Sequence, residues 1–419
     1  MKVLGISAPW SGSGKTTVSM MLASLLNDSV TFKIGPDFID SGLLRAISNK
    51  GENIDRYLEG NAYKRLICNY EKYEYGIFEG VMGLYDSGLD FDNSTYYYFK
   101  NLRIPHILVI DVSKMAESAY RIYKGYKNKY TAGVILNNFY GEKHFNIVKR
   151  DFEKYNVKIF GAVPRDESIK INERHLGLYT FMENNNIENI KRSAEKYLNK
   201  EILEVFSDIE CREREKEKIS INNNKKIYVA MDKAFNFYYE YNLNLLSKLG
   251  KIEYFSPLND DILEKPDFIY LGGGYPELYI EDLSRNRRTK ESIIEAYNNN
   301  VPVYGECGGL MYMMDNIDGK KMLGIFDGSV KSRVKLTLNY TELIPSKDIL
   351  FFKKGMRIFG HEFHYSLIDT EEIPLMKNLR GNGIKDGMDG LNSKNGFGMY
   401  THIHFFRYRK FLENFFRKY

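Results

Sequence analysis

The chain has 419 residues, which is too many for one ordinary hydrophobic core, so two or three domains are expected. Hydrophobic residues make up 43% of the chain and charged residues 27%, and the net charge of +5 gives no reason to expect a nucleic-acid partner. The three cysteines lie far apart, which excludes a disulfide framework and suits a reducing cytoplasm, and no run of 18 apolar residues predicts a membrane span.

The first predicted strand leads into a phosphate-binding motif. Residues 2–8 are apolar and predict a buried strand rather than a signal peptide, and residues 18–26 have the apolar spacing of a helix. Between them stands Pro-Trp-Ser-Gly-Ser-Gly-Lys-Thr-Thr, which is typical of a Walker A loop except that Pro9 replaces the first glycine. The alternative is a surface turn before a helix.

In such a loop the lysine reaches the β- and γ-phosphates, and the hydroxyl that follows it binds Mg²⁺. These roles fall to Lys15 and Thr16. The residues expected to bind nucleotide are Gly12, Ser13, Gly14, Lys15, Thr16 and Thr17.

Acidic residues stand at the ends of the next two predicted strands, residues 32–35 and 75–83. Asp37 and Asp40 follow the first strand, and Glu79 lies within the second. Open α/β sheets bind ligands at the carboxyl ends of their strands, so the two aspartates would bind Mg²⁺ or position a substrate. Glu79 would act as a Walker-B-like Mg²⁺ ligand or would orient water. Helix capping explains the two aspartates equally well.

Further apolar stretches with polar ends alternate with helical stretches and predict a doubly wound parallel sheet. They span residues 104–111, 131–138 and 157–164. Beyond them, Arg174 and His175 would meet an anion at the edge of the sheet, although a solvated helix start explains them better on chemistry alone.

A strongly polar, charged stretch then predicts a solvated helix and linker over residues 201–225. We therefore expect one α/β domain at residues 1–200 and a second at residues 226–419.

The second domain begins with another α/β pattern. Apolar stretches at residues 227–232, 252–258 and 268–271 predict strands. The last of these enters Gly272-Gly273-Gly274-Tyr275, where three glycines allow backbone N–H groups to face a developing oxyanion. A simple tight turn is the alternative.

Cys307 lies on a predicted turn between a strand and a helix. The sequence there is Tyr-Gly-Glu-Cys-Gly-Gly-Leu-Met, in which Gly305 and Gly309 flank the cysteine at two residues on either side. A nucleophile on a sharp turn of this kind needs small neighbours because the backbone is strained and other atoms approach closely. The pattern favours a nucleophilic thiol over a buried structural cysteine.

A thiol nucleophile needs a base, and histidines are concentrated near the end of the chain. On a predicted strand at residues 399–405, His402 and His404 would share one face, so either would serve as the base. A zinc site built from these two and from His361 and His364 lacks the spacing of a zinc protease, and no cysteine cluster joins it.

Taken in order, these motifs resemble the cobyrinate a,c-diamide synthase family over nearly the whole chain. The first half carries Gly-Ser-Gly-Lys-Thr-Thr, Gly-Pro-Asp-Phe-Ile-Asp, Asn-Ile-Asp, Glu-Gly-Val-Met-Gly-Leu-Tyr-Asp and Glu-Arg-His-Leu-Gly-Leu. The second half carries Asp-Lys-Ala-Phe-Asn-Phe-Tyr-Tyr, Phe-Ser-Pro-Leu, Gly-Gly-Gly-Tyr-Pro-Glu-Leu, Gly-Glu-Cys-Gly-Gly, Gly-His-Glu-Phe-His-Tyr-Ser and Tyr-Thr-His-Ile-His-Phe.

The resemblance implies a P-loop domain of the dethiobiotin synthetase type followed by a class I glutamine amidotransferase domain. Cys307 would attack glutamine, His402 would activate the thiol, and amides near Gly274 and Gly308 would form the oxyanion hole. Many class I enzymes have a glutamate two residues after the histidine; His404 stands there, so a Cys–His pair without an acidic third member is expected.

The first domain would use ATP and Mg²⁺, held with Thr16, Asp37 and Glu79, to phosphorylate a substrate carboxylate. Ammonia from glutamine would then displace phosphate. In this family the substrate is a tetrapyrrole whose a- and c-acetate groups are amidated in turn. The residues suggested for substrate contact are Asp40, Tyr85, Asp86, Arg174 and His175.

The resemblance implies a cytoplasmic enzyme that acts on small molecules and has no nucleic-acid or membrane partner. It is compatible with a homodimer. Ser41 and Leu44 stand where the family usually has proline and histidine, which weakens the assignment of substrate contacts there. Cobyrinate is the expected substrate. Nickel-sirohydrochlorin, the substrate of a close branch, is the alternative, and so are a cobyric acid synthase-type amidase and a P-loop binding protein.

Overall fold

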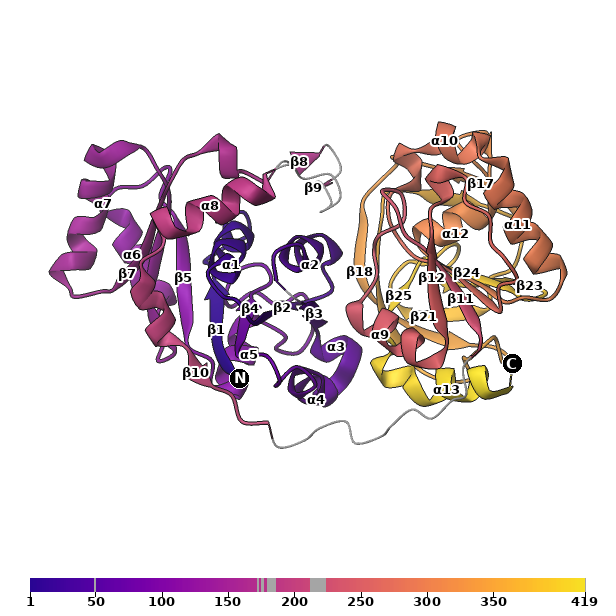
Figure 1. Cartoon of the computed structure of the whole chain (residues 1–419), viewed down its shortest axis with the longest axis horizontal. Helices are drawn as coiled ribbons and strands as arrows, with labels where there is room; N and C mark the ends of the chain where they lie inside the picture. The colour runs from indigo at the N-terminus through magenta and orange to yellow at the C-terminus, as the bar shows by residue number, and fades with distance from the viewer. Residues whose placement is uncertain (49, 172, 175–176, 179–185, 212–223, 419) are drawn as a thin grey trace. The chain divides into compact units, whose positions relative to one another are not determined.

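The structure is a computed structural model that describes residues 1–48, 50–171, 173–174, 177–178, 186–211 and 224–418. It divides into two compact units, Met1–Lys216 and Glu217–Tyr419, which are described separately (Figure 1). Across the described residues, no helix combines the length and the apolar character needed to cross a lipid bilayer.

The first unit is built on a twisted sheet of parallel strands in the order β3-β2-β4-β1-β5-β6-β7, with β10 added antiparallel to the start of β1. The strands are β1 (Lys2–Ser7), β2 (Ser29–Ile34), β3 (Lys50–Ile54), β4 (Tyr75–Glu79), β5 (His106–Asp111), β6 (Thr131–Phe139), β7 (Ile159–Pro164) and β10 (Ser207–Asp208). The chain passes from β1 to β2 on one side of β1, and later from β4 to β5 on the other side. The loop after β1 therefore lies where the strand order reverses, which is the usual ligand site of open α/β sheets.

Helices cover both faces of this sheet. Val18 of α1, Leu43 of α2 and Ile190 of α8 pack with Leu4 and other apolar strand residues into one buried core. On the opposite face the ring of Phe99 on α5 lies directly over the glycine at position 5. The helices are α1 (Lys15–Ser24), α2 (Phe38–Arg45), α3 (Arg56–Glu59), α4 (Tyr63–Cys68), α5 (Thr95–Leu102), α6 (Ser118–Tyr126), α7 (Gly141–Lys154) and α8 (Ile187–Tyr197).

The second unit contains a six-stranded sheet in the order β12-β11-β13-β14-β24-β23, parallel except for its last pair. Its strands are β11 (Lys226–Ala230), β12 (Lys251–Phe255), β13 (Phe268–Leu271), β14 (Val303–Glu306), β23 (Leu391–Ser393) and β24 (Gly396–Met399). The helices of this unit are α9 (Glu240–Leu249), α10 (Ile280–Arg285), α11 (Arg287–Asn298), α12 (Gly308–Met313) and α13 (Arg409–Lys418).

Two smaller sheets complete the second unit. One has the order β22-β21-β18-β19-β25 and is antiparallel throughout, and the other has the order β16-β15-β17-β20. Their strands are β15 (Met314–Ile317), β16 (Lys320–Lys321), β17 (Phe326–Lys331), β18 (Thr337–Pro345), β19 (Ile358–His364), β20 (Leu367–Asp369), β21 (Met376–Arg380), β22 (Met388–Asp389) and β25 (His402–Ile403). The antiparallel sheet joins the parallel one through the segment that connects β24 to β25.

The predicted α/β architecture is confirmed, with local differences. The buried edge strand β3 has the sequence Lys-Gly-Glu-Asn-Ile and was not expected, because it lacks the apolar run on which the strand prediction relied. The predicted linker begins at residue 201, but residues 200–205 form a 3₁₀ helix and β10 pairs with β1. Most of the predicted solvated helix lies outside the described residues. The short strand pair β8 (Glu173–Arg174) and β9 (Gly177–Leu178) is also described.

Gly133 in β6 offers a test of how tightly the first sheet is packed. A Cβ at this position would stand 2.4 Å from the carbonyl oxygen of Lys158, so Gly133→Ala must move backbone and should lower the free energy of unfolding by about 1–3 kcal/mol. Gly125→Ala in α6 is the matched control, because its Cβ would meet nothing within 4 Å and alanine favours helix by up to about 1 kcal/mol. Urea unfolding followed by circular dichroism would measure both, and equal stability of the two variants would contradict this packing.

Candidate active sites

The loop after β1 has the backbone geometry of a phosphate-binding loop. Gly12 and Gly14 have φ angles of 77° and 95°, which residues with a Cβ rarely adopt. Gly14 caps α1, and a Cβ there would stand 2.2 Å from the amide nitrogen of Asn137. That amide donates a hydrogen bond of 2.9 Å to the carbonyl oxygen of Ser13. The first turn of α1 carries no acidic residue, so its free N–H groups are left for an anion.

Lys15 and Thr16, the first residues of α1, lie close to Glu79 at the end of β4. The ammonium of Lys15 donates to the carbonyl oxygen of Met82 at 2.7 Å, and the Thr16 hydroxyl donates to Glu79 Oε1 at 2.8 Å. Burial lowers the pKa of Lys15 to about 8, and the neighbouring positive charge of Lys33 contributes to the shift. An anionic phosphate would stabilise the charged form of this lysine. Thr17 follows, half-buried in the same turn.

Lys33 is a buried cation between two carboxylates, and its importance was not foreseen from the sequence. It forms an ion pair with Asp40 and another, at 2.7 Å, with Glu79 Oε1. Burial alone would lower the pKa of Lys33, but Asp40 and Glu79 together raise it above its usual value. The pairing in turn holds the pKa of Asp40 below its usual value despite burial. The signal in the sequence was a lysine inside an otherwise apolar strand.

Asp37 and Asp40 differ in position, although both follow β2. Asp37 caps α2: its Oδ1 accepts hydrogen bonds of 2.9 Å from the N–H groups of Ile39 and Asp40. Burial and the charge of Asp40 raise the pKa of Asp37 to about 7. Capping was one of the two interpretations of these aspartates, and for Asp37 the structure supports it.

A Mg²⁺ ion fits the donors at this end of the sheet. Glu79 Oε2 is buried and has no hydrogen-bond partner among the described residues, and the Thr16 hydroxyl lies on the other oxygen of the same carboxylate. Within the described ranges no group of three or more His, Cys, Asp or Glu side chains could hold a metal ion by itself. Mg²⁺ commonly uses one or two carboxylates and completes its shell with water and substrate phosphate, so this donor set is sufficient.

The residues suggested for substrate contact lie in different settings. Tyr85 is 43% exposed and Asp86 is also exposed, and both stand in the loop after β4. Asp86 accepts a hydrogen bond of 3.0 Å from the N–H of Gly83, which fixes the loop next to Lys15. Arg174 belongs to the short strand β8, and His175 lies outside the described residues.

The backbone at Cys307 is strained in the way a nucleophile on a sharp turn requires. Its φ of 49° and ψ of −103° are rare for a residue with a Cβ and cost on the order of 1–3 kcal/mol. Glycines make the turn possible: a Cβ on Gly305 would stand 2.5 Å from the sulfur of Met313, and one on Gly309 would stand 2.0 Å from the carbonyl oxygen of Leu271. The cysteine therefore joins β14 to α12 at a point where neighbouring backbones nearly touch.

The glycine-rich turn after β13 lies against this elbow. A Cβ on Gly308 would stand 3.1 Å from the nitrogen of Gly274, so the two residues whose amides were expected to bind an oxyanion are neighbours. Gly274 has a φ of 153° and would clash with the carbonyl oxygen of Ala234 if it carried a Cβ. Position 274 therefore requires glycine, and the arrangement fits an oxyanion hole.

The Cys307 thiol is protonated in this resting arrangement. Burial raises its pKa well above the usual value, and the negative charge of Glu277 raises it further, whereas the N–H of Gly308 acts in the opposite direction. The thiol donates a hydrogen bond of 3.4 Å to the carbonyl oxygen of Phe363 on β19. A base is therefore needed to form the thiolate.

His402 lies next to the glycine turn and to a carboxylate that the sequence analysis did not foresee. A Cβ on Gly273 would stand 2.2 Å from Cε1 of the His402 ring. Nδ1 of the same ring lies 3.6 Å from Oε2 of Glu306, the residue immediately before the nucleophile. Glu306 also accepts hydrogen bonds from the hydroxyls of Tyr270 at 2.9 Å and Tyr304 at 2.6 Å. The expected Cys–His pair thus has an acidic neighbour, supplied by a strand residue instead of by position 404.

The other histidines are placed differently. β25 ends at Ile403, so His404 does not continue the strand face of His402; its ring stacks on Tyr241 and its Nδ1 accepts from the N–H of Phe406. His361 pairs with His402 across β19 and β25, and their rings stack with centroids 4.9 Å apart. Burial and the charge of His402 lower the pKa of His361 well below its usual value, so His361 is neutral.

Comparison with known protein families agrees with both halves of this description. Residues 5–178 match a CobQ/CobB/MinD/ParA nucleotide binding domain, and residues 226–410 match a CobB/CobQ-like glutamine amidotransferase domain. The chain is therefore of the class of enzymes that join a P-loop nucleotide-binding domain to a glutamine amidotransferase domain.

Curated relatives identify the family. The chain is 38% identical to a cobyrinate a,c-diamide synthase of Sulfolobus acidocaldarius, over 97% of this chain and 98% of the relative. It is 35% identical to one of Clostridium acetobutylicum, over 99% of both chains, and 38% identical to one of Methanococcus maripaludis, over 96% of this chain and 97% of the relative. The chain belongs to the cobyrinate a,c-diamide synthase family.

The buried charges around Lys33 predict a pH-dependent loss of stability in Lys33→Met. The variant leaves Asp40 and Glu79 buried without their cation, which should cost about 3–5 kcal/mol at pH 7. The paired Asp40 has a lowered pKa, so its contribution to stability is complete above the ordinary carboxyl pKa and is lost as the pH falls from there through the lowered pKa. The deficit of the variant should therefore shrink as the pH falls below about 4. Urea unfolding at several pH values would measure it.

The control is Lys149→Met, which removes an exposed i,i+4 pair with Glu153 at 3.2 Å and should change stability by less than about 0.5 kcal/mol. A Lys33→Met deficit as small as that of the control, or one that does not depend on pH, would contradict the assignment of Lys33 as the compensating charge.

Proposed function

We propose that this enzyme amidates the a- and c-acetate carboxylates of cobyrinate, using ATP and ammonia released from glutamine. The observation that carries the proposal is the strained thiol elbow at Cys307, on a chain that also carries a phosphate-binding loop. The names of its relatives support the choice of substrate. A P-loop binding protein with an inert second domain would have no use for the strain at Cys307.

Glutamine hydrolysis would begin with transfer of the Cys307 proton to His402. The thiolate attacks the carboxamide carbon of glutamine, and the N–H groups near Gly274 and Gly308 stabilise the oxyanion that forms. The carbon–nitrogen bond then breaks, His402 returns the proton to the departing nitrogen, and ammonia leaves a thioester on Cys307. Water hydrolyses the thioester to glutamate and regenerates the thiol.

Glu306 would orient the imidazole of His402 and stabilise its protonated form. Its Oε2 faces Nδ1 of the ring at 3.6 Å, and the hydroxyls of Tyr270 and Tyr304 keep the carboxylate in place. This is the part that an aspartate plays beside histidine in a catalytic triad. Glu306 acts through His402, so it is a positioning residue.

Activation of the substrate would take place in the first unit. The loop amides and Lys15 bind the ATP phosphates, and Thr16 and Glu79 hold Mg²⁺, with Asp40 beside them. The ion would neutralise charge on the phosphates. Asp37, one of the Mg²⁺ ligands expected from the sequence, would act through the start of α2, which places Asp40. An oxygen of the substrate carboxylate would attack the γ-phosphorus of ATP, and ADP would leave. Ammonia would then attack the carbonyl carbon of the acyl phosphate, phosphate would leave with the surplus proton, and the amide would remain.

Exposed side chains in the loop after β4 are the best placed to meet the substrate. Tyr85 and Asp86 stand beside the phosphate loop, and Asp86 acts electrostatically on Lys15. Arg174 and His175 remain proposals based on the sequence alone.

The two-site scheme is tested by Cys307→Ser in the full chain, assayed with cobyrinate, ATP and Mg²⁺. This variant should lose glutamine-dependent amidation by more than about 10³-fold, because serine is not activated in a site built for a thiol, yet should keep amidation with ammonium chloride. Lys15→Ala should lose both activities. Cys211→Ser, at a cysteine outside both sites, is the control and should keep both.

Retention of both activities by Lys15→Ala would remove the phosphate loop from the mechanism, and loss of ammonia-dependent activity in a folded Cys307→Ser protein would refute separate sites. The same assay with nickel-sirohydrochlorin in place of cobyrinate tests the substrate. Amidation of the nickel compound alone would overturn the choice of cobyrinate while leaving the two-site scheme intact.

The role of Glu306 is tested by Glu306→Gln, which keeps the shape but removes the charge. Glutamine-dependent kcat/KM should fall by roughly 10²- to 10⁴-fold, as in triads that lose their acid. The loss should fall on kcat, with KM for glutamine nearly unchanged, because Glu306 acts through His402 and not on the substrate. Tyr304→Phe, which removes only a donor to Glu306, should have a much smaller effect, and ammonia-dependent amidation should be unchanged. A loss that falls on KM instead of kcat would argue against this role.

A further inference from the structure

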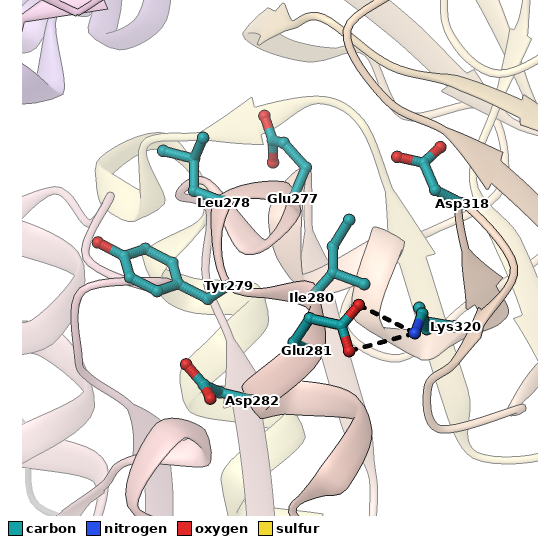
Figure 2. Close-up of a pocket in the computed structure, with 8 residues that line it drawn as sticks. All are labelled: Glu277, Leu278, Tyr279, Ile280, Glu281, Asp282, Asp318 and Lys320. Carbon is teal, nitrogen blue, oxygen red and sulfur yellow. Dashed lines mark hydrogen bonds and ion pairs between the residues drawn. The ribbon is translucent and has the colours of Figure 1, made fainter.

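A cavity of about 300 Å³ lies beside the oxyanion turn, between the 3₁₀ helix η5 (Pro276–Leu278), the start of α10 and the turn from β15 to β16. Figure 2 shows Glu277 and Asp318 in the upper part of the view and the paired Glu281 and Lys320 below them. Its size is at the lower end of the range of small-ligand sites, roughly 300–1,000 Å³.

The acidic residues that line this cavity differ in whether their carboxylate oxygens have partners or face solvent. Glu281 pairs with Lys320 at 2.9 Å, and Asp318 accepts a hydrogen bond of 2.6 Å from the hydroxyl of Ser332. Asp282 is exposed to solvent. Glu277 is only 6% exposed, and its Oε2 has no hydrogen-bond partner among the described residues. A buried carboxylate oxygen without a donor is costly, so a ligand that supplies N–H groups would relieve the cost.

Glu277 is also close to the reacting thiol. It follows Pro276, whose Cδ would stand 2.9 Å from a Cβ on Gly308, the residue after the nucleophile. Its charge is the second largest influence on the Cys307 thiol, after burial itself. A ligand that touches Glu277 therefore reaches toward Cys307 as well.

We infer that Glu277 binds the α-ammonium group of the glutamine whose carboxamide is attacked by Cys307. This inference rests on the proposed function and specifies how the same site recognises its nitrogen donor. Glutamine is a short molecule with the α-ammonium and α-carboxylate groups at one end and the scissile carboxamide at the other. An ammonium group supplies three N–H donors and a charge, which complements a buried carboxylate whose Oε2 has no hydrogen-bond partner among the described residues.

Other charges act on Glu277 from neighbouring segments. Burial raises its pKa to about 7, the positive charge of Arg333 opposes the rise, and Asp318 adds to it. The carboxylate is therefore largely ionised at pH 8 and largely protonated at pH 6. Because only the ionised form pairs with an ammonium group, KM for glutamine should rise as the pH falls through 7.

The inference is tested by measuring glutamine hydrolysis by the full chain with two amides. L-Glutamine carries the α-ammonium group, and 4-carbamoylbutanoate is the same amide without it. Wild-type enzyme should prefer L-glutamine in kcat/KM by roughly 10- to 100-fold. Glu277→Gln should raise KM for L-glutamine by a similar factor, leave kcat nearly unchanged and lose the preference. Glu253→Gln, at a partly exposed residue paired with Lys251, is the control and should behave as wild type.

Several outcomes would overturn the inference. Equal use of the two amides by wild-type enzyme, or a preference unchanged in Glu277→Gln, would do so. So would a kcat loss that is equal for both amides, because that would indicate a structural or proton-transfer role. Circular dichroism and urea unfolding check that the variant is folded, and ammonia-dependent amidation should match wild type.

If Glu277→Gln does not fold, two measurements on the wild-type enzyme test the inference. They are its preference for L-glutamine over 4-carbamoylbutanoate and the pH dependence of its KM for L-glutamine. A KM that stays constant between pH 6 and 8 would then overturn the inference. Complete absence of glutaminase activity in folded wild-type enzyme would instead show that the proposed function itself is wrong.

Discussion

The backbone strain at Cys307 is the constraint on which the second unit depends. A residue with a Cβ is held at a φ of 49° only because the surrounding chain leaves it no other path. Gly305, Gly308 and Gly309 allow β13, β14 and the oxyanion turn to approach within distances that any other side chain would forbid. The same close approach buries the thiol and brings the amide donors beside it. Strain, burial and oxyanion binding are thus consequences of one packing arrangement.

Burial of charge shapes the chemistry of both units. In the first unit, Lys33 pairs with Asp40 and Glu79, and it holds the pKa of Asp40 below its usual value at the end of a sheet where phosphate is expected to bind. In the second unit, two carboxylates act near one thiol. Glu306 faces His402, the proposed base, and Glu277 raises the pKa of the Cys307 thiol. Binding of a cation at Glu277 would cancel the latter effect, so substrate binding itself would favour formation of the thiolate.

Part of each candidate active site could be predicted because its residues are contiguous in the sequence. The phosphate loop and the elbow each lie within one short stretch, where glycine spacing and neighbouring apolar runs reveal strand, turn and helix. The period of a strand could not separate His402 from His404, and the family resemblance favoured His402. The structure shows that their surroundings differ, because β25, which pairs with β19, ends before His404. Likewise, Asp37 and Asp40 have the same chemistry, and only the capping geometry of α2 separates their roles.

The sequence by itself determined the fold class and the two sets of motifs, and it predicted Cys307 as the nucleophile, because each is encoded locally. Tertiary structure alone decided which distant groups meet. Lys33 joins Glu79 across neighbouring strands, and Glu306 meets His402 although 96 residues separate them in the chain. Glu277 becomes buried, with its Oε2 left without a partner among the described residues, only when η5 is packed against the elbow. Such contacts depend on burial and register, which no short stretch of sequence specifies.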